Sequence, residues 1–196
     1  MDKTNLYHPT MIFVGGWPFS GKTSLAERLR DELKIHHVDI DEIRWLAIGK
    51  PHPHPNESPE LMKRDVQEMG GAYRFLFTII DWHLEMGRSI LATATLSSKP
   101  HGQDKLRVVY EKYPNARIRI IQCVPQGDTK ETVRGLMTNR DFGAGGYKGA
   151  VNSPERYFKV KGRYNPIELP HVKIPTWGSS NSIDDEVRQA LDYILS

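Results

Sequence analysis

The sequence has 196 residues, of which 38% are hydrophobic and 26% are charged, and its formal net charge is +3. This size fits one α/β domain with a sizeable core, at most with a lid, and the composition is ordinary for a soluble enzyme. The single cysteine excludes an internal disulfide, no apolar run is long enough to span a bilayer, and residues 1–9 show no secretory signal. A cytoplasmic enzyme without a membrane partner is therefore expected.

The first predicted elements are a strand, a glycine-rich loop and a helix. Residues 10–14 are apolar and β-rich, which is typical of a buried strand. Residues 15–24 read GGWPFSGKTS and match the pattern G-x-x-x-x-G-K-[ST] at Gly16, Gly21, Lys22 and Thr23. A helix is expected to follow, because apolar positions repeat every four residues at Leu25, Leu29 and Leu33.

This loop indicates a bound nucleoside triphosphate. Its glycines let the backbone curl so that successive N–H groups face phosphate oxygens, and the N-terminus of the following helix also favours anions. Lys22 can reach the β- and γ-phosphates, and the Thr23 hydroxyl can ligate the accompanying Mg²⁺. ATP and Mg²⁺ are the expected ligands, with GTP left open, and the expected binding residues are Gly16, Ser20, Gly21, Lys22, Thr23 and Ser24. The alternative for this loop is an ordinary Gly-Pro surface turn.

A second motif follows the next predicted strand, residues 36–40. The motif is Asp39-Ile40-Asp41-Glu42-Ile43-Arg44, which begins in the last residues of this strand and continues beyond it. Ligands bind at the carboxyl ends of strands in an open parallel sheet, so these acids should face the glycine-rich loop. Asp41 can then accept the proton of an attacking hydroxyl, and Arg44 can hold an anionic group of the acceptor. The alternative is structural, with Asp39 or Asp41 capping a helix that begins near Glu42.

With these two motifs the sequence resembles the small P-loop kinases, among them adenylyl-sulfate kinase, gluconate kinase, chloramphenicol phosphotransferase, zeta toxin and the polynucleotide kinase domain. The resemblance covers residues 10–196 loosely, and its specific part is the two motifs. It implies an ATP-dependent phosphotransferase built on a five-stranded parallel sheet. It also implies that Asp41 is the general base and that Arg44 contacts the acceptor. The rest of the sequence matches no single member, so the identity of the acceptor stays open.

The middle of the chain is predicted to hold a loop, a long helix and a third strand. Residues 49–56 are rich in proline, and their two histidines are a poor chelate without further ligands, so a rigid loop near the acceptor is favoured over a metal site. A helix is expected from Pro59 to about residue 84, with a break or a close-packing point at Gly70-Gly71. Residues 88–95 form the third strand, which ends without the acid that motor ATPases and GTPases usually carry there. This favours a kinase.

The net positive charge of the chain is concentrated in one segment near its C-terminal third. Between Lys130 and Arg163 there are eight basic and three acidic residues, which suits a segment that closes over an anionic ligand. The resembled kinases have lid arginines here, and Arg134 and Arg140 look like those residues. They lie six positions apart and do not share a helical face, so only one is expected to act. The alternative for each is a surface ion pair.

The other elements of this part follow from local patterns. Residues 141–149 are a glycine-rich flap, and residues 151–170 either build the acceptor pocket or form a solvated loop. The expected regular elements are a helix near residues 106–110, a strand at 116–124, a helix at 128–139, a fifth strand at 172–177 and a last helix capped by Ser182. Pro175 in the fifth strand indicates either an edge strand or the end of a strand.

Together these observations predict one P-loop kinase domain of the α/β class over residues 1–196. Its five-stranded parallel sheet carries helices on both faces, and residues 128–170 form the lid and acceptor-site segment. The domain is expected to transfer the γ-phosphate of ATP to a hydroxyl of a small-molecule acceptor. The expected catalytic residues are Asp41, Lys22, Arg134 and Arg140; the substrate-binding residues are Asp39 and Arg44; and the metal ligand is Thr23.

Three alternatives remain open. A polynucleotide 5′-hydroxyl kinase would use the same chemistry, but the modest net charge argues against a nucleic-acid partner. A nucleotide-driven ATPase or switch protein would have no acceptor, and the missing acid of the third strand argues against it. A toxin that phosphorylates a sugar nucleotide belongs to the kinase class. The oligomeric state is not predicted.

Overall fold

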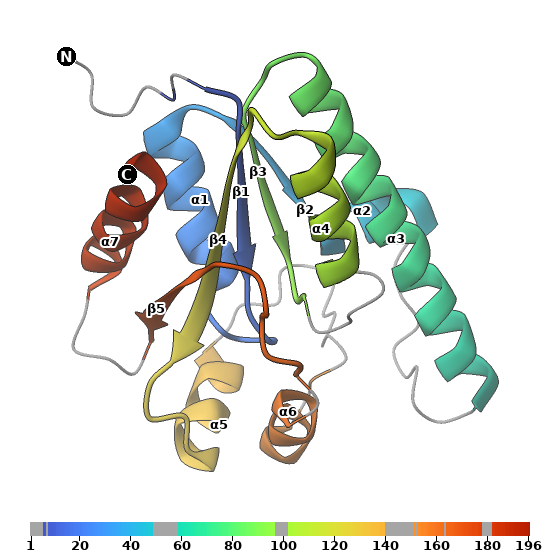
Figure 1. Cartoon of the computed structure of the whole chain (residues 1–196). Coiled ribbons are helices and arrows are strands. Elements are labelled where there is room, and N and C mark those ends of the chain that lie inside the picture. Colours follow the sequence, from blue (N-terminus) through green and yellow to red (C-terminus); the bar gives the residue numbers. More distant parts are fainter. Residues whose placement is uncertain are drawn as a thin grey trace.

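In the computed structural model the chain folds around a five-stranded, all-parallel sheet with strand order β2-β3-β1-β4-β5 (Figure 1). The structure describes residues 6, 8–48, 59–96, 102–139, 151, 153–162, 164–177 and 182–196. The strands are β1 (Thr10–Gly15), β2 (His36–Asp39), β3 (Ile90–Ala94), β4 (Arg117–Pro125) and β5 (Val172–Thr176). The helices are α1 (Lys22–Leu33), α2 (Ile40–Ile48), α3 (Pro59–Glu85), α4 (Asp104–Lys112), α5 (Lys130–Asn139), α6 (Pro154–Lys161) and α7 (Ile183–Leu195). The fold class predicted from the sequence is confirmed.

The central strand β1 fixes the position of the glycine-rich loop. It pairs with β3 on one side and β4 on the other, and Gly15 lies level with Ala94 and Gln122 of these neighbours. All six residues of β1 are buried, which is why the strand is a nearly continuous apolar run. The loop that follows therefore begins at the middle of the carboxyl edge of the sheet.

Helices cover the sheet on both faces and make two separate hydrophobic cores (Figure 1). Helices α3 and α4 pack on one face, where Leu76 and Ile80 join Phe13 of β1. Helices α1 and α7 pack on the other face, where Leu29 joins Val14. Successive residues of a strand point to opposite faces, so β1 contributes to both cores. This is the doubly wound arrangement expected from the sequence.

Helices α5 and α6 stand apart from these layers, beyond the carboxyl ends of the strands (Figure 1). They share a third hydrophobic cluster with the glycine-rich loop, formed by Trp17, Val133, Val151 and Tyr157. Helix α6 lies within residues 151–170, where the sequence left a pocket or a solvated loop open. Its start is well defined, because Ser153 Oγ accepts a hydrogen bond from the Arg156 backbone N–H and Pro154 occupies the first turn.

Helix α3 runs for 27 residues without interruption through Gly70-Gly71. A break at this pair, one of the two possibilities drawn from the sequence, is therefore wrong. Two glycines lower helix propensity by about 1 kcal/mol each, but the tertiary burial of the helix outweighs that loss. Tyr73, Leu76 and Ile80, which follow the pair, are almost completely buried. Neither α3 nor any other helix among the described residues is long and apolar enough to cross a membrane.

The only cysteine, Cys123, lies on β4 inside the core that α1 and α7 cover. Burial raises the pKa of its thiol to about 12. Because the reactive species is the thiolate, we expect no labelling of the folded protein by a disulfide reagent at about pH 8 and complete labelling after unfolding in denaturant. Rapid labelling of the native protein, followed by spectrophotometry, would show that β4 opens far more readily than its burial indicates.

Candidate active site

The glycine-rich loop, residues 15–24, has a backbone that requires glycine at two of its positions. Gly21 has a φ of 81°, in the left-handed region that favours glycine, and it caps the N-terminus of α1. A Cβ atom on Gly16 would lie 2.1 Å from Ser20 Oγ, so the chain closes too tightly for any side chain there. Lys22 follows as the first residue of α1, and its side chain is buried. The two fixed glycines of the motif are thus explained by turn geometry and close approach.

The loop fits a triphosphate accompanied by Mg²⁺. Ser20 Oγ is buried and has no hydrogen-bond partner among the described residues, and a phosphate oxygen would supply one. Thr23 lies half-buried in the first turn of α1. No cluster of three or more His, Cys, Asp or Glu side chains suited to a metal occurs in the part of the chain that the structure describes.

Asp39 ends β2 and is held from two sides. Its Oδ1 accepts a hydrogen bond of 2.7 Å from the Asp41 backbone N–H, so Asp39 caps α2. Its Oδ2 accepts a hydrogen bond from the Thr93 hydroxyl of β3, the residue that pairs with Asp39 in the sheet. The capping role that the sequence left open between two acids therefore belongs to Asp39.

His37 continues this chain of hydrogen bonds behind Asp39. Its Nε2 lies 3.1 Å from Thr93 Oγ1, whose proton is already given to Asp39. Burial lowers the pKa of His37, so the ring is neutral near pH 7 and donates from Nε2 to the threonine oxygen. The relay of His37, Thr93 and Asp39 fixes the first turn of α2, and with it the position of Asp41.

Asp41 lies one residue into α2, and its side chain is exposed. Burial raises the pKa of Tyr73, and the negative charge of Asp41 contributes to that rise. The Tyr73 hydroxyl is 3.1 Å from Thr95 Oγ1, just beyond the end of β3. Since β3 lies between β2 and β1, the Asp41 carboxylate lies along the same carboxyl edge from which the glycine-rich loop emerges.

Arg44 lies one turn further along α2 and is held by α3. Its Nη2 is 3.2 Å from Glu68 Oε2, and both side chains are mostly buried. Arg64 contacts the other oxygen of Glu68 at 2.8 Å. Burial would raise the pKa of Glu68, but the hydrogen bonds from the two arginines lower it overall, so the carboxylate stays charged. Arg44 is thereby fixed in orientation.

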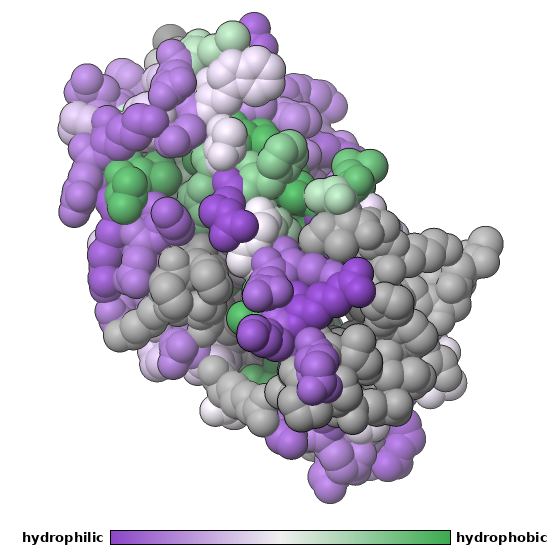
Figure 2. All heavy atoms as spheres, turned by 90° about the vertical axis from the view of Figure 1, so that its right-hand side faces the viewer, coloured by the Kyte–Doolittle hydropathy of each residue, from purple (hydrophilic) through white to green (hydrophobic). Residues whose placement is uncertain are grey.

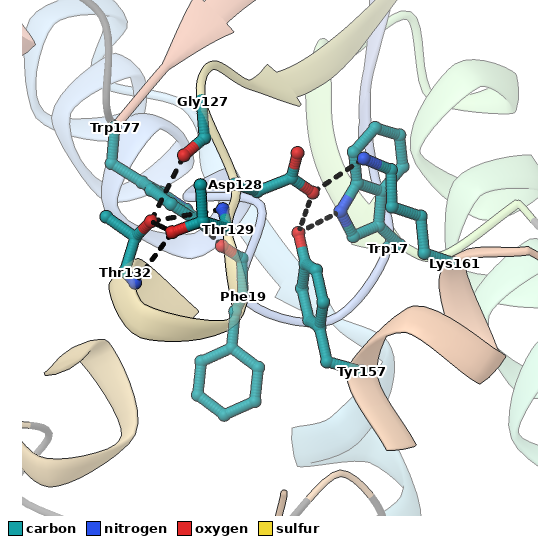
Figure 3. A network of polar contacts seen from close by, with 9 residues as sticks. All are labelled: Trp17, Phe19, Gly127, Asp128, Thr129, Thr132, Tyr157, Lys161 and Trp177. Carbon is teal, nitrogen blue, oxygen red and sulfur yellow. Dashed lines mark hydrogen bonds and ion pairs between the residues drawn. The ribbon is translucent and has the colours of Figure 1, made fainter. Parts of the chain in front are cut away.

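The variable part of the glycine-rich loop is tied to α6 through Trp17 (Figure 3). Trp17 Nε1 donates a hydrogen bond of 2.7 Å to the Tyr157 hydroxyl, which in turn donates to Asp128 Oδ2 at 2.9 Å. Lys161 Nζ lies 2.6 Å from the same Asp128 oxygen and 5.0 Å from the centre of the Trp17 ring. Burial raises the pKa of Tyr157, so its hydroxyl keeps the proton that this arrangement needs.

A second set of contacts ties the loop to β5. The Trp177 indole N–H donates to the carbonyl of Phe19 (Figure 3). Thr176 Oγ1 donates to the carbonyl of Ser20 at 2.8 Å. Phe19 has a φ of 63°, which is unfavourable for an aromatic residue and has to be enforced by its surroundings. The loop is therefore anchored to the end of β5 on one side and to α6 on the other.

Replacing Tyr157 with phenylalanine is expected to lower the free energy of unfolding by about 1–3 kcal/mol, because the buried Trp17 indole N–H loses its acceptor. Urea unfolding followed by circular dichroism measures this change. Tyr193→Phe is the matched control, since no described residue forms a hydrogen bond with its hydroxyl. Equal stability of the two variants would contradict the role given to Tyr157.

The structure brings together some of the residues predicted from sequence and leaves others apart. The glycine-rich loop, Asp39, Asp41 and Arg44 all lie at the carboxyl edge of the sheet. Ser24 is exposed on α1, and Arg134 is exposed on α5. Arg140, the flap at 141–149 and the two histidines of residues 49–56 lie outside the described residues.

Sequence reasoning missed the residues that hold this site from a distance. Thr93, Glu68, Asp128 and Tyr157 are 24 to 140 positions away from the groups that they contact. No local pattern marks such partners. The structure alone identifies them.

Comparison with known proteins agrees with this geometry. Residues 2–126 match the family model described as zeta toxin, and this region is more than half of the chain. No curated protein is similar enough in sequence to match.

Solved structures with a similar fold include several small-molecule kinases. A sugar kinase from Janibacter sp. HTCC2649 is 17% identical, with a TM-score of 0.64 and 94% of each chain covered. A gluconokinase from Sinorhizobium meliloti 1021 is 12% identical, with a TM-score of 0.60, covering 95% of this chain and 92% of that chain. The APS kinase of Mycobacterium tuberculosis, in complex with AMPPNP and APS, is 18% identical, with a TM-score of 0.60 and coverage of 96% and 99%. At these identities the likeness establishes the fold.

Proposed function

Because the chain belongs to the zeta toxin family, we propose that it is an ATP-dependent kinase that transfers the γ-phosphate to a hydroxyl of a small-molecule acceptor. The observation that carries this proposal is the difference in surroundings between two neighbouring acids, Asp39 and Asp41. Asp39 is used in capping α2 and in accepting from Thr93, whereas Asp41 is exposed at the edge of the sheet where ligands bind. A carboxylate there is suited to take a proton from an acceptor.

The nucleotide side of the reaction is assigned to the glycine-rich loop. Its backbone N–H groups and the N-terminus of α1 surround the phosphates, Ser20 donates to a phosphate oxygen, and Lys22 neutralises charge on the β- and γ-phosphates. The chemistry that a bound Mg²⁺ would supply here is a lowering of the negative charge that repels the nucleophile. Thr23 would hold the ion directly, and Asp39 would help to place either the water shell of the ion or the acceptor.

The acceptor side is assigned to α2. Asp41 accepts the hydroxyl proton while the acceptor oxygen bonds to the γ-phosphorus and the bond to the bridging β–γ oxygen breaks, which releases ADP. Arg44, kept in place by Glu68, binds an anionic or polar part of the acceptor. Arg134 or Arg140 neutralises charge on the transferring group from the lid and acceptor-site segment, residues 128–170, of a single domain.

The test is transfer of labelled γ-phosphate from ATP with Mg²⁺ to a panel of acceptors. The panel holds sugars, gluconate, shikimate, adenylyl-sulfate, aminoglycosides, chloramphenicol, nucleosides, sugar nucleotides, and DNA and RNA 5′ ends. Label on one small molecule supports the proposal and names the acceptor. Label on nucleic-acid ends, lost steeply as salt rises, would replace it with a polynucleotide kinase. ATP hydrolysis at one rate with every acceptor and with none would replace it with a nucleotide-driven switch.

A further inference from the structure

The first half of the glycine-rich loop contains a tight turn with an unusual residue. The Ser20 backbone N–H donates a hydrogen bond of 3.1 Å to the Trp17 carbonyl, which closes a β-turn over residues 17–20. Proline at the second position, Pro18, and a positive φ at the third, 63° at Phe19, are the pattern of a type II turn. The third position of such a turn is normally glycine, because an L side chain disfavours positive φ. Phe19 therefore adopts a conformation that its own backbone preference opposes.

The side chain of Phe19 gives a reason for an aromatic residue in this turn. Its ring packs against the third hydrophobic cluster, formed by Trp17, Val133, Val151 and Tyr157. In Figure 3 the ring points away from the polar contacts that surround the loop. A glycine would suit the turn better but would leave the cluster without this ring. Contacts from outside the turn must therefore keep Phe19 at positive φ.

Trp177, the residue after β5, supplies such a contact. Its indole N–H donates to the Phe19 carbonyl. Trp177 is itself fixed, because its own carbonyl accepts a hydrogen bond of 3.1 Å from the Gln126 backbone N–H just beyond β4. The next carbonyl of the loop, that of Ser20, accepts a hydrogen bond of 2.8 Å from the Thr176 hydroxyl. Two successive carbonyls of the loop are thus held by the carboxyl end of the sheet.

We propose that Trp177 is a positioning residue for nucleotide binding: its indole N–H keeps Phe19 at positive φ, and so keeps the glycine-rich loop in the shape that receives a triphosphate. The inference rests on the proposed function, which assigns the triphosphate to this loop. Ser20 closes the turn, and its Oγ is a buried hydroxyl without a hydrogen-bond partner among the described residues. A change of φ at Phe19 displaces that hydroxyl, which is assigned to a phosphate oxygen.

The size of the effect follows from the preference of L residues for negative φ. Without the hydrogen bond from Trp177, Phe19 is free to leave the left-handed region, where an L side chain is disfavoured. This preference lowers the fraction of molecules with a competent loop by on the order of 10-fold, and the apparent affinity for ATP falls by the same factor. A glycine at this position has no such preference, so it needs no enforcement.

The test introduces Trp177→Phe into three chains, which are the wild type, Phe19→Ala and Phe19→Gly. Both replacements of Phe19 remove the ring, but only glycine tolerates positive φ. Calorimetry with ATP and Mg²⁺ measures the affinity in each chain. Trp177→Phe should weaken binding by on the order of 10-fold in the wild type and in the Phe19→Ala chain, and by less than about 2-fold in the Phe19→Gly chain. Equal losses in the last two chains would mean that Trp177 acts through packing, and would overturn the inference.

Trp82→Phe is the matched control for the loss of an indole. Trp82 is 59% exposed, and its indole N–H forms no hydrogen bond with any residue that the structure describes. Helix α3, which carries Trp82, lies on the face shown in Figure 2, whereas β5 forms the opposite edge of the sheet (Figure 1). This variant should bind ATP as the wild type does.

Urea unfolding of Phe19→Ala and Phe19→Gly tests the turn without a nucleotide, and it needs no variant of Trp177. At a position with positive φ the glycine chain should be the more stable of the two, which reverses the usual order. The opposite order would overturn the inference by showing that Phe19 is not held against its preference. Absence of ATP binding to the wild type would instead overturn the proposed function, and with it the nucleotide role given to Trp177. The two failures are thus distinguishable.

Discussion

Replacing Asp41 with asparagine is expected to slow phosphate transfer by about 10²- to 10⁴-fold, the range that a positioned general base contributes. ATP binding should be unchanged, because Asp41 lies on α2 and the nucleotide is assigned to the loop and α1. The helix should also stay capped, since the backbone N–H of residue 41, which the substitution retains, is the donor to Asp39. The measurements are the transfer rate with the acceptor found in the panel, and nucleotide affinity by calorimetry.

Glu42→Gln is the matched control for this variant. Glu42 is the neighbouring acid in the same first turn, and it is also exposed, so its replacement removes the same charge from the same helix end. It should keep nearly the wild-type rate. If the Asp41 variant transfers phosphate as fast as the wild type, the general base is a different group.

Replacing Lys22 with methionine is expected to abolish measurable transfer, because the ammonium group is the only side-chain cation of the loop motif. Loss of one charge-stabilising group in an active site typically costs a factor of about 10² to 10³ in rate, and weaker ATP binding adds to that loss. The buried aliphatic stem is retained, so the fold should be unaffected. Transfer and nucleotide affinity should therefore fall together, unlike in the Asp41 variant.

Arg30→Met controls for removing a positive charge from α1. Arg30 lies on the solvent side of the same helix and pairs with its neighbour Asp31. Its replacement should leave transfer and ATP affinity as they are. Wild-type ATP affinity in the Lys22 variant would mean that the triphosphate lies elsewhere.

The fold was largely predictable because its signals are local. The apolar run of β1, the glycine motif and the leucine repeat of α1 are contiguous, and together they specify strand, loop and helix. The Ser182 cap of α7 likewise appears as a capping box with Asp185. In such stretches each residue interacts mainly with its near neighbours in sequence.

The missed features depend on interactions that no local pattern records. Helix α6 begins at Ser153-Pro154, the same pair type that marked the start of α3 at Ser58-Pro59. Its apolar side is short and packs in the cluster that contains Trp17 and Val133 of α5. The sequence also left the cap of α2 open between two acids. Thr93, 54 positions from Asp39, donates a hydrogen bond to one carboxylate oxygen of Asp39. This long-range contact helps to orient Asp39 as the cap of α2, and the local sequence does not record it.

The order of strands in the sheet has a consequence for synthesis of the chain. The central strand β1 is made first, but its partners come much later, with Met11 pairing to Ile90 and to Ile118. Strand β2 must also wait for β3, with which it pairs at the edge of the described sheet. No native strand pairing can therefore form on the ribosome until residues near 94 have left the exit tunnel. Until then the most apolar strand is exposed without a partner, which makes the nascent chain a substrate for chaperones and a risk for aggregation.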